Sequence, residues 1–136
     1  MKIELKRKDL LYPESSYEIV GVLYSVFTEL GYGYKEEQYQ KAIEIMFKSR
    51  NIDYAKELPI RLSFKGKFLT TLYLDFLVYK KIVLEIKQGN KFNKKDIDQV
   101  YNYLVATKLK LGILARFTRT GVKTMRIVNL PYERTK

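Results

Sequence analysis

Two carboxylates and a lysine interrupt adjacent apolar segments of the chain. Asp75 lies within the run Leu72–Val78, and Glu85 and Lys87 lie within the run Ile82–Lys87. An ionised carboxylate is costly in apolar surroundings unless its charge is compensated or its pKa is raised. One divalent cation would compensate both acids, and hard cations such as Mg²⁺ share their oxygen ligands with phosphate. The pattern therefore predicts metal-assisted hydrolysis of a phosphodiester.

Strand geometry would bring these three side chains to one site. Side chains alternate along a strand, so Glu85 and Lys87 share a face. If Asp75 lies directly opposite Glu85 in a hairpin, the connecting loop consists of the three residues Tyr79–Lys81. A two-residue loop would instead place the two carboxylates on opposite faces of the sheet, and no site would form. The three-residue loop is therefore the condition that the metal site requires.

The spacing of these residues resembles the D…(D/E)-x-K core of the PD-(D/E)XK nuclease superfamily. Nine residues separate Asp75 from the tripeptide Glu85–Lys87. Upstream, Gly33, Glu36 and Tyr39 form a G-x-x-E-x-x-Y pattern, which resembles the signature of the GxxExxY proteins within that superfamily. The order of the predicted elements is also similar. The resemblance extends over nearly the whole chain and implies a nuclease with a restriction-endonuclease-like core.

The resemblance also implies roles for individual residues. Asp75 and Glu85 would hold one or two Mg²⁺ or Mn²⁺ ions, with the main-chain carbonyl of Ile86 as a further ligand. Glu36 would assist, directly or through water, although a glutamate at a helix start also complements the helix dipole. Lys87 would orient or help deprotonate the attacking water. An ion pair between the acids and the lysine across the sheet is the alternative.

The segment after the Glu85–Lys87 strand carries a second pattern. Gln99 and Tyr103 are one helical turn apart and resemble the Q-x-x-x-Y element of RecB-type members, which implies that Gln99 points towards the catalytic edge. Tyr103 would position Gln99 or the substrate, or would simply belong to the core. The other candidate contacts to nucleic acid are Lys91, Lys94, Lys95, Tyr34, Arg116 and Arg119. For each of these residues, a role in packing or at the solvated surface stays open.

Composition limits the functions that fit this chain. Its 136 residues favour one domain over residues 1–136, and 26 Lys and Arg against 15 Asp and Glu give a net charge of +11. This excess favours a polyanionic partner, and we expect nucleic acid, with DNA preferred. The absence of Cys and His excludes disulfides, thiolate zinc sites and histidine acid–base chemistry. The charged segment at residues 1–8 and the lack of long apolar runs favour a soluble, cytoplasmic protein without a membrane span.

Periodicity predicts an α/β (α+β) domain, a mixed central sheet flanked by helices in the order ααβββαββ. A Pro-Glu-Ser-Ser helix start and a glycine stop delimit the first helix, and Asn93 is a plausible cap for the third. The helices are expected at residues 13–30, 36–50 and 93–107. The strands are expected at residues 53–64, 68–79, 82–87, 111–117 and 125–130.

Three alternatives to a simple nuclease stay open at this point. A Holliday junction resolvase would be a homodimer that prefers branched DNA. A non-catalytic module would bind nucleic acid without cutting it, and a partner-binding protein would bind neither metal nor DNA tightly. Self-association is undecided, because the apolar strand at residues 111–117 would pair either inside the sheet or across subunits.

Overall fold

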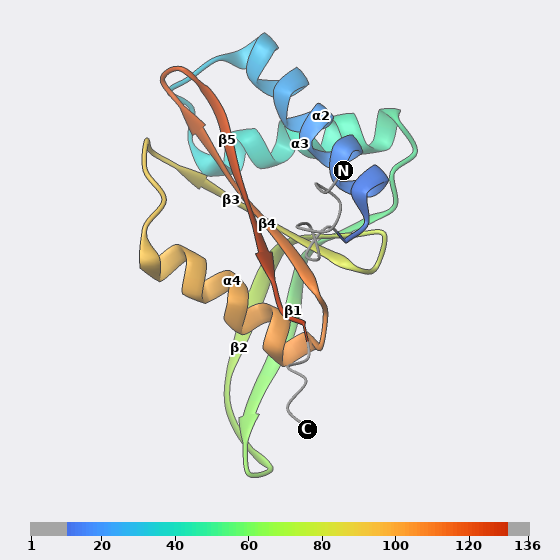
Figure 1. The fold of residues 1–136 in the computed structure, drawn as a ribbon, viewed down its shortest axis with the longest axis vertical. Coiled ribbons are helices and arrows are strands. Elements are labelled where there is room, and N and C mark those ends of the chain that lie inside the picture. The colour runs from blue at the N-terminus through green and yellow to red at the C-terminus, as the bar shows by residue number, and fades with distance from the viewer. Residues whose placement is uncertain (1–10, 131–136) are drawn as a thin grey trace, which may run out of the picture.

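The computed structural model describes residues 11–130, so the charged segment at residues 1–8 lies outside the described part. The order of the elements is the predicted one, and Figure 1 shows their arrangement. The elements are α2 (Pro13–Leu30), α3 (Glu36–Ser49), β1 (Tyr54–Phe64), β2 (Lys67–Val78), β3 (Ile82–Gln88), α4 (Lys94–Thr107), β4 (Leu111–Thr118) and β5 (Gly121–Val128).

The five strands form one mixed sheet in the order β1-β2-β3-β4-β5. All neighbours are antiparallel except β3 and β4, which run parallel and are joined through α4. The predicted α+β architecture is therefore confirmed. Strand β4 pairs with β3 on one side and β5 on the other, so the apolar strand is internal to the sheet of one chain.

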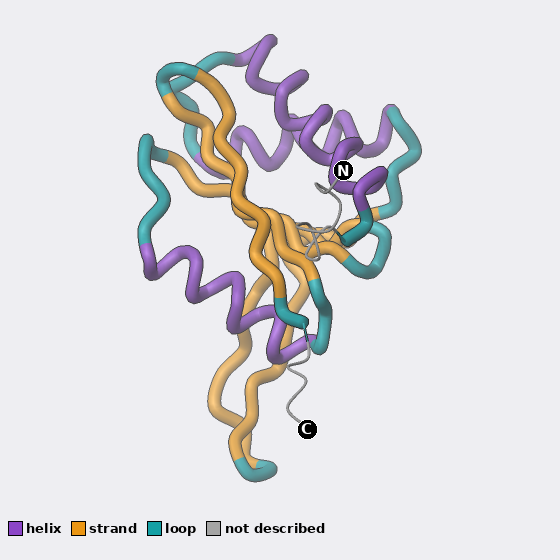
Figure 2. Tube along the Cα trace, viewed as in Figure 1, coloured by secondary structure: helices purple, strands orange, loops and turns teal. Residues whose placement is uncertain are grey.

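Helices cover both faces of the sheet and create two cores. On one face, α2 and α3 bury a large apolar cluster that includes Leu23, Phe47 and Phe117. On the other face, α4 packs Val100 and Leu104 onto the sheet. Figure 2 shows α4 on its own side, away from the α2–α3 pair. Because both faces are covered, every residue of β4 is buried, as expected for a strand with a parallel neighbour inside a sheet.

The start of the last strand was predicted wrongly. We expected residues 125–130 after a turn at Arg119-Thr120-Gly121, but β5 already begins at Gly121, which pairs with Thr118. This strand lies at the edge of the sheet, and Lys123 and Thr124 are exposed. Its first half therefore lacks the apolar alternation on which the prediction relied. The other boundaries agree with the predictions within two residues.

The hairpin register that the chemistry requires is the one observed. Val78 pairs with Ile82 and Phe76 pairs with Leu84, which leaves the three residues Tyr79–Lys81 in the loop. Two of them, Tyr79 and Lys80, have left-handed backbone conformations with φ of 55° and 58°. Beyond the Phe76–Leu84 pair the strands separate, and in Figure 1 β2 turns away with β1 while β3 runs towards the α3 side.

The β1–β2 ladder is distorted at the same level. Glu57 has a φ of 52° and lies opposite Asp75, between the regular pairs Lys56–Phe76 and Leu58–Leu74. In a regular strand Leu74 and Phe76 would share a face. Here Leu74 packs under α4, whereas Phe76 packs on the α2–α3 side. The regular alternation of β2 side chains between the two faces of the sheet is therefore interrupted at Asp75, the proposed catalytic aspartate.

In the described part of the chain, none of the helices combines the length and the apolar character needed to cross a bilayer.

Close packing of α4 on the sheet depends on Gly112 in β4. A Cβ atom at this position would lie 2.6 Å from Cγ1 of the buried Val100. We predict that Gly112→Ala lowers the free energy of unfolding by about 1–3 kcal/mol, because the helix must move to relieve the overlap. Urea denaturation followed by circular dichroism measures this change. In the matched control Gly21→Ala, within α2, the nearest atom to the new Cβ is Nη1 of Arg50, 3.8 Å away, and stability should stay equal or rise. Equal stability of both variants would contradict the close approach.

Candidate active site

The two acids meet where β2 and β3 separate. The backbone N–H of Asp75 donates a hydrogen bond to Oε2 of Glu85 (2.9 Å), and the N–H of Ile86 donates to Oδ2 of Asp75 (2.9 Å). Each carboxylate thus accepts the main-chain donor of the opposite strand at the end of the regular ladder. This reciprocal bonding satisfies backbone groups that would otherwise be left unpaired in the interior. It also fixes both side chains on the same side of the hairpin.

Burial makes the charged forms of these acids costly. Glu85 is only 2% exposed, and desolvation, reinforced by the charge of Asp75, raises the pKa of Glu85 to about 8. Desolvation also raises the pKa of Asp75, although the N–H of Ile86 and the charge of Lys87 act in the opposite direction. Two acids that share a partly dry site and repel each other form a pair that a bound cation would stabilise.

Lys87 completes the triad and is held by a residue that the sequence analysis missed. Its Nζ lies 4.0 Å from Oδ1 of Asp96 in the first turn of α4. The other carboxylate oxygen of Asp96 pairs with Arg116. The backbone N–H of Asp96 donates to Oδ1 of Asn93, which is the predicted cap of α4. In the sequence, Asp96 was indistinguishable from an ordinary helix-start acid, because its link to Lys87 exists only in the folded chain.

Arg116 is not placed for the phosphate contact considered for it. The sequence left open whether this residue contacts a phosphate backbone or balances an acid, and its side chain is buried, with 3% exposure. Besides its ion pair with Asp96, its Nη1 donates to the carbonyl oxygen of Gln88 (2.7 Å). Arg116 therefore joins β3, β4 and α4, and both terminal nitrogens of its guanidinium are bonded within the protein.

Glu36 anchors the start of α3 to the end of β3. Its Oε2 accepts a hydrogen bond from the N–H of Gln88 (3.1 Å), and its charge contributes to the raised pKa of Asp75. The tyrosine of the same motif, Tyr39, donates its hydroxyl proton to the carbonyl of Gly31 and so closes the turn before the helix. Across residues 11–130, no three Asp, Glu, His or Cys side chains are grouped as a metal shell. Participation of Glu36 as a ligand thus stays a prediction.

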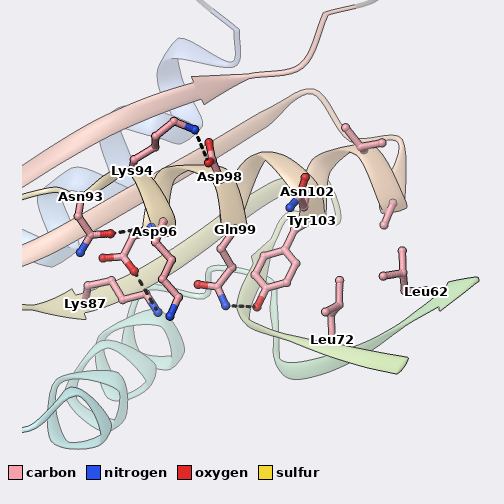
Figure 3. A pocket seen from close by; sticks show the side chains of 13 residues that line it. Leu62, Leu72, Lys87, Asn93, Lys94, Asp96, Asp98, Gln99, Asn102 and Tyr103 are labelled. Carbon is pink, nitrogen blue, oxygen red and sulfur yellow. Dashed lines mark hydrogen bonds and ion pairs between the residues drawn. The ribbon is translucent and has the colours of Figure 1, made fainter. Parts of the chain in front are cut away.

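Gln99 and Tyr103 lie together on α4, as their spacing predicts, and Figure 3 shows the bond between them. Nε2 of Gln99 donates to the hydroxyl of Tyr103 (3.0 Å), which itself donates to the carbonyl of Tyr73 (3.0 Å). Tyr103 is 3% exposed, so it belongs to the core. It ties α4 to β2 two residues before Asp75.

A cavity of about 1240 Å³ lies beside these residues, between α4 and the outer part of the β1–β2 hairpin. Lys87, Gln99 and Tyr103 line its polar end, and Leu62 and Leu72 line it farther out (Figure 3). Its other lining residues come from α4 and its cap: Asn93, Lys94, Lys95, Asp96, Asp98, Asn102, Val105 and Ala106.

Of the remaining predicted contacts, Lys94 and Lys95 line this cavity, and the others lie at the surface. Lys94 pairs with Asp98 at 2.7 Å, while Lys91 and Lys95 are exposed. Arg119 lies over the ring of Tyr32, 5.3 Å from its centroid. Tyr34 is 42% exposed, with its ring edge against Tyr39. Contacts from these residues to nucleic acid stay predictions.

The fold and the acidic pair define a restriction-endonuclease-like domain. The family model of the PD-(D/E)XK nuclease superfamily matches residues 13–128. The chain belongs to the PD-(D/E)XK nuclease superfamily, whose nucleases typically use divalent metal ions. The match is at the level of the superfamily, so the finer resemblance to the GxxExxY proteins stays a prediction.

Two solved structures share the fold. The crystal structure of SSO0001 aligns with a TM-score of 0.54 and 21% identity, covering 72% of this chain and 52% of that chain. An alkaline exonuclease (LHK-Exo) from Laribacter hongkongensis aligns with a TM-score of 0.50 and 15% identity, covering 69% and 55%. The chain thus spans about half the length of these proteins. No curated protein matches the sequence.

The bond from Tyr103 to Tyr73 provides a test of positioning. We predict that Tyr103→Phe lowers the free energy of unfolding by about 1–2 kcal/mol, because the carbonyl of Tyr73 loses its buried partner. Thermal or urea unfolding measures the change. As a matched control, Tyr101→Phe alters a tyrosine of the same helix that is 43% exposed, and it should stay within about 0.5 kcal/mol of the parent. Equal effects of the two substitutions would show that the bond to Tyr73 does not stabilise the fold.

The acidic pair also predicts a pH dependence of stability without divalent metal. The pKa of Glu85 lies at about 8 in the folded protein and near its ordinary value of 4.5 in the unfolded chain. The folded state therefore binds more protons between these values, and the free energy of unfolding should fall as the pH rises from about 4.5 to 8. Urea denaturation at a series of pH values in a chelator measures the slope.

Two variants distinguish the contribution of Glu85 to this pH dependence from the contributions of the other carboxylates. Glu85→Gln keeps the side-chain acceptor but cannot ionise, so the fall in stability should become shallower. Glu37→Gln removes an exposed carboxylate of α3 and should leave the slope as it is in the parent. A parent protein whose stability rises over this pH range would contradict the raised pKa.

Proposed function

We propose that this protein is a metal-dependent nuclease that hydrolyses phosphodiester bonds in DNA. The observation that carries the proposal is the reciprocal bonding of Asp75 and Glu85 across the separating strands, with Lys87 on the same strand as Glu85. Membership of the PD-(D/E)XK nuclease superfamily supports the reaction class. The similarity to an exonuclease structure, at 15% identity, supports the fold.

The acidic pair fits a divalent cation. Asp75 and Glu85 provide carboxylate oxygens in a partly dry site, where Lys87 and two backbone N–H groups compensate their charges only in part. We infer that these two residues hold Mg²⁺ or Mn²⁺, with Glu36 and the carbonyl of Ile86 as further ligands. When bound, the cation supplies a Lewis acid that polarises the phosphate and lowers the pKa of a coordinated water. The absence of His and Cys from the sequence favours such hard cations over zinc.

Lys87 is the residue we assign to the attacking water. Its ammonium, held by Asp96 at 4.0 Å, orients the water and offsets the negative charge that grows on the phosphate oxygens. The water oxygen attacks phosphorus in line with the leaving O3′ and releases a proton to the solvent, and as the P–O3′ bond breaks O3′ takes a proton from the solvent. The products are a 5′-phosphate and a 3′-hydroxyl. Gln99, at the polar end of the cavity, offers an amide to the substrate or the water.

The net charge of +11 supports a polyanionic substrate. We assign backbone contacts to the exposed Lys91 and Lys95 at the start of α4 and to Arg119, with Lys94 and Tyr34 as further candidates. DNA is the polymer that we expect from the sequence, and RNA is the alternative. A junction resolvase would require a homodimer, and β4 is already paired on both sides, so a dimer would have to use another surface.

Cleavage of a labelled substrate panel tests the proposal. The panel contains single-stranded, duplex, splayed and four-way-junction DNA and RNA, each with Mg²⁺, Mn²⁺ or a chelator. We predict metal-dependent cleavage that falls about 100-fold or more in Asp75→Asn, Glu85→Ala and Lys87→Ala, because each removes a group that acts in the transition state. Circular dichroism shows whether each variant is folded. Lys80→Ala, at the exposed β2–β3 turn, should cut at the parental rate.

Cleavage that persists in a chelator, or that survives Asp75→Asn at the original rate, would contradict the assigned mechanism. DNA binding without any cleavage by the parent protein would indicate the non-catalytic binding module. Preference for the four-way junction would indicate a resolvase.

A further inference from the structure

The outer part of the β1–β2 hairpin projects from the body of the protein. We call residues 58–74 the β1–β2 arm, because they lie beyond the distortion at Glu57 and Asp75. Figures 1 and 2 show this hairpin extending past the sheet, with its turn far from α2 and α3. All residues from 63 to 70, which include the turn, are exposed. The tip of the arm therefore contributes little to the core of the protein.

The charge of the arm has one sign. Residues 58–74 contain three cations, Arg61, Lys65 and Lys67, and no acid. All three cations are exposed. A projecting element with this charge is complementary to a polyanion and would repel a basic surface, including a second copy of this chain.

Large apolar side chains lie between these cations. Phe64 is 61% exposed, Phe68 is 49% exposed and Leu69 is 57% exposed. The guanidinium of Arg61 lies 4.4 Å from the centroid of the Phe68 ring, and Nζ of Lys65 lies 5.8 Å from that of Phe64. Each aromatic ring thus has a cation beside it. Aromatic faces flanked by cations are the elements with which proteins bind single-stranded nucleic acid.

The arm and the candidate active site border the same cavity. Leu62 and Leu72 of the arm line the cavity that Lys87 and Gln99 line at its polar end. Along β2, Phe68 is seven residues from Asp75, which at about 3.4 Å per residue places Phe68 at most about 24 Å from the acid. A strand that passes Lys87 and Gln99 can therefore continue along the cavity towards the outer end of the arm.

We propose that the β1–β2 arm binds an unpaired stretch of the DNA strand that enters the active site. Phe64 and Phe68 stack on bases, and the arm cations contact phosphates. A phenylalanine ring has no hydrogen-bonding group and offers only its faces and edge. In a duplex the base faces are covered except at the ends, so these rings select unpaired bases. The proposal rests on the proposed function for the identity of the polymer, but binding by the arm requires no cleavage.

Binding in a chelator tests the arm separately from catalysis. Fluorescence anisotropy with a single strand of about fifteen nucleotides and with a blunt duplex measures both affinities. Phe64→Ala/Phe68→Ala should weaken binding of the single strand about tenfold or more and binding of the duplex by less. Tyr17→Ala, which removes an aromatic ring that is 81% exposed on α2, is the matched control and should leave both affinities unchanged.

A pair of lysines tests the phosphate contacts. Lys65 and Lys80 both occupy hairpin turns with left-handed backbone conformations, with φ of 49° and 58°. Lys65→Ala should reduce the salt dependence of single-strand binding by about 0.7 in the slope of log K against log salt. Lys80→Ala makes the same chemical change at the other turn and should leave the slope unchanged.

The outcomes separate the arm from the nuclease. Cleavage by the parent protein, with equal single-strand affinities in the parent and the phenylalanine variant, would overturn the arm proposal and leave the proposed function intact. Loss of single-strand binding in the variant, with no cleavage by the parent, would support the arm and reject the nuclease. Self-association that disappears in the variant while DNA affinity is unchanged would make the tip a protein interface and would also overturn the proposal.

Discussion

The separation of β2 and β3 at Asp75 is the constraint on which the rest of the structure depends. Once the strands part, their main-chain donors lose the ladder partners that a sheet provides. The carboxylates of Asp75 and Glu85 accept two of these donors, at 2.9 Å each, and are thereby held in the interior. A polar pair that would be costly in a core is thus part of how the backbone is satisfied. The same separation sends β2 into the arm and opens the space beside α4.

Helix α4 connects the two separated strands. Near its start, Asp96 lies within 4.0 Å of Lys87 on β3 and pairs with Arg116 on β4. Two turns later, Tyr103 donates to the carbonyl of Tyr73 on β2. The helix is also the crossover that makes β3 and β4 parallel, so its position follows from the topology. The groups that position the lysine and the aspartate therefore come from one rigid element, which suits a site that must keep its geometry.

The features that could be predicted from the sequence are those that depend on local pattern. Periodicity was enough for the element order, and the hairpin register is the one that a site shared by Asp75 and Glu85 requires. Features set by tertiary contact were missed. The left-handed conformation of Glu57, which accompanies the interrupted alternation of β2 side chains, has no local signal. Arg116 looked like a surface cation because its strand could be seen as an edge, whereas β4 is buried from end to end.

The tip of the arm is exposed, whereas the edge strand β1 carries features that oppose association with another strand. Strand β1 lies at the edge of the sheet, where unpaired main-chain groups invite association. Along this edge the chain carries Pro59, which lacks an N–H, and the irregular Glu57, both of which oppose pairing with another strand. The protection stops short of the tip, where Phe64 and Phe68 stay exposed. Because β1 carries features that oppose pairing with another strand, the exposed rings are better explained by a bound ligand than by incomplete folding. The positive charge of the arm favours a polyanion as that ligand.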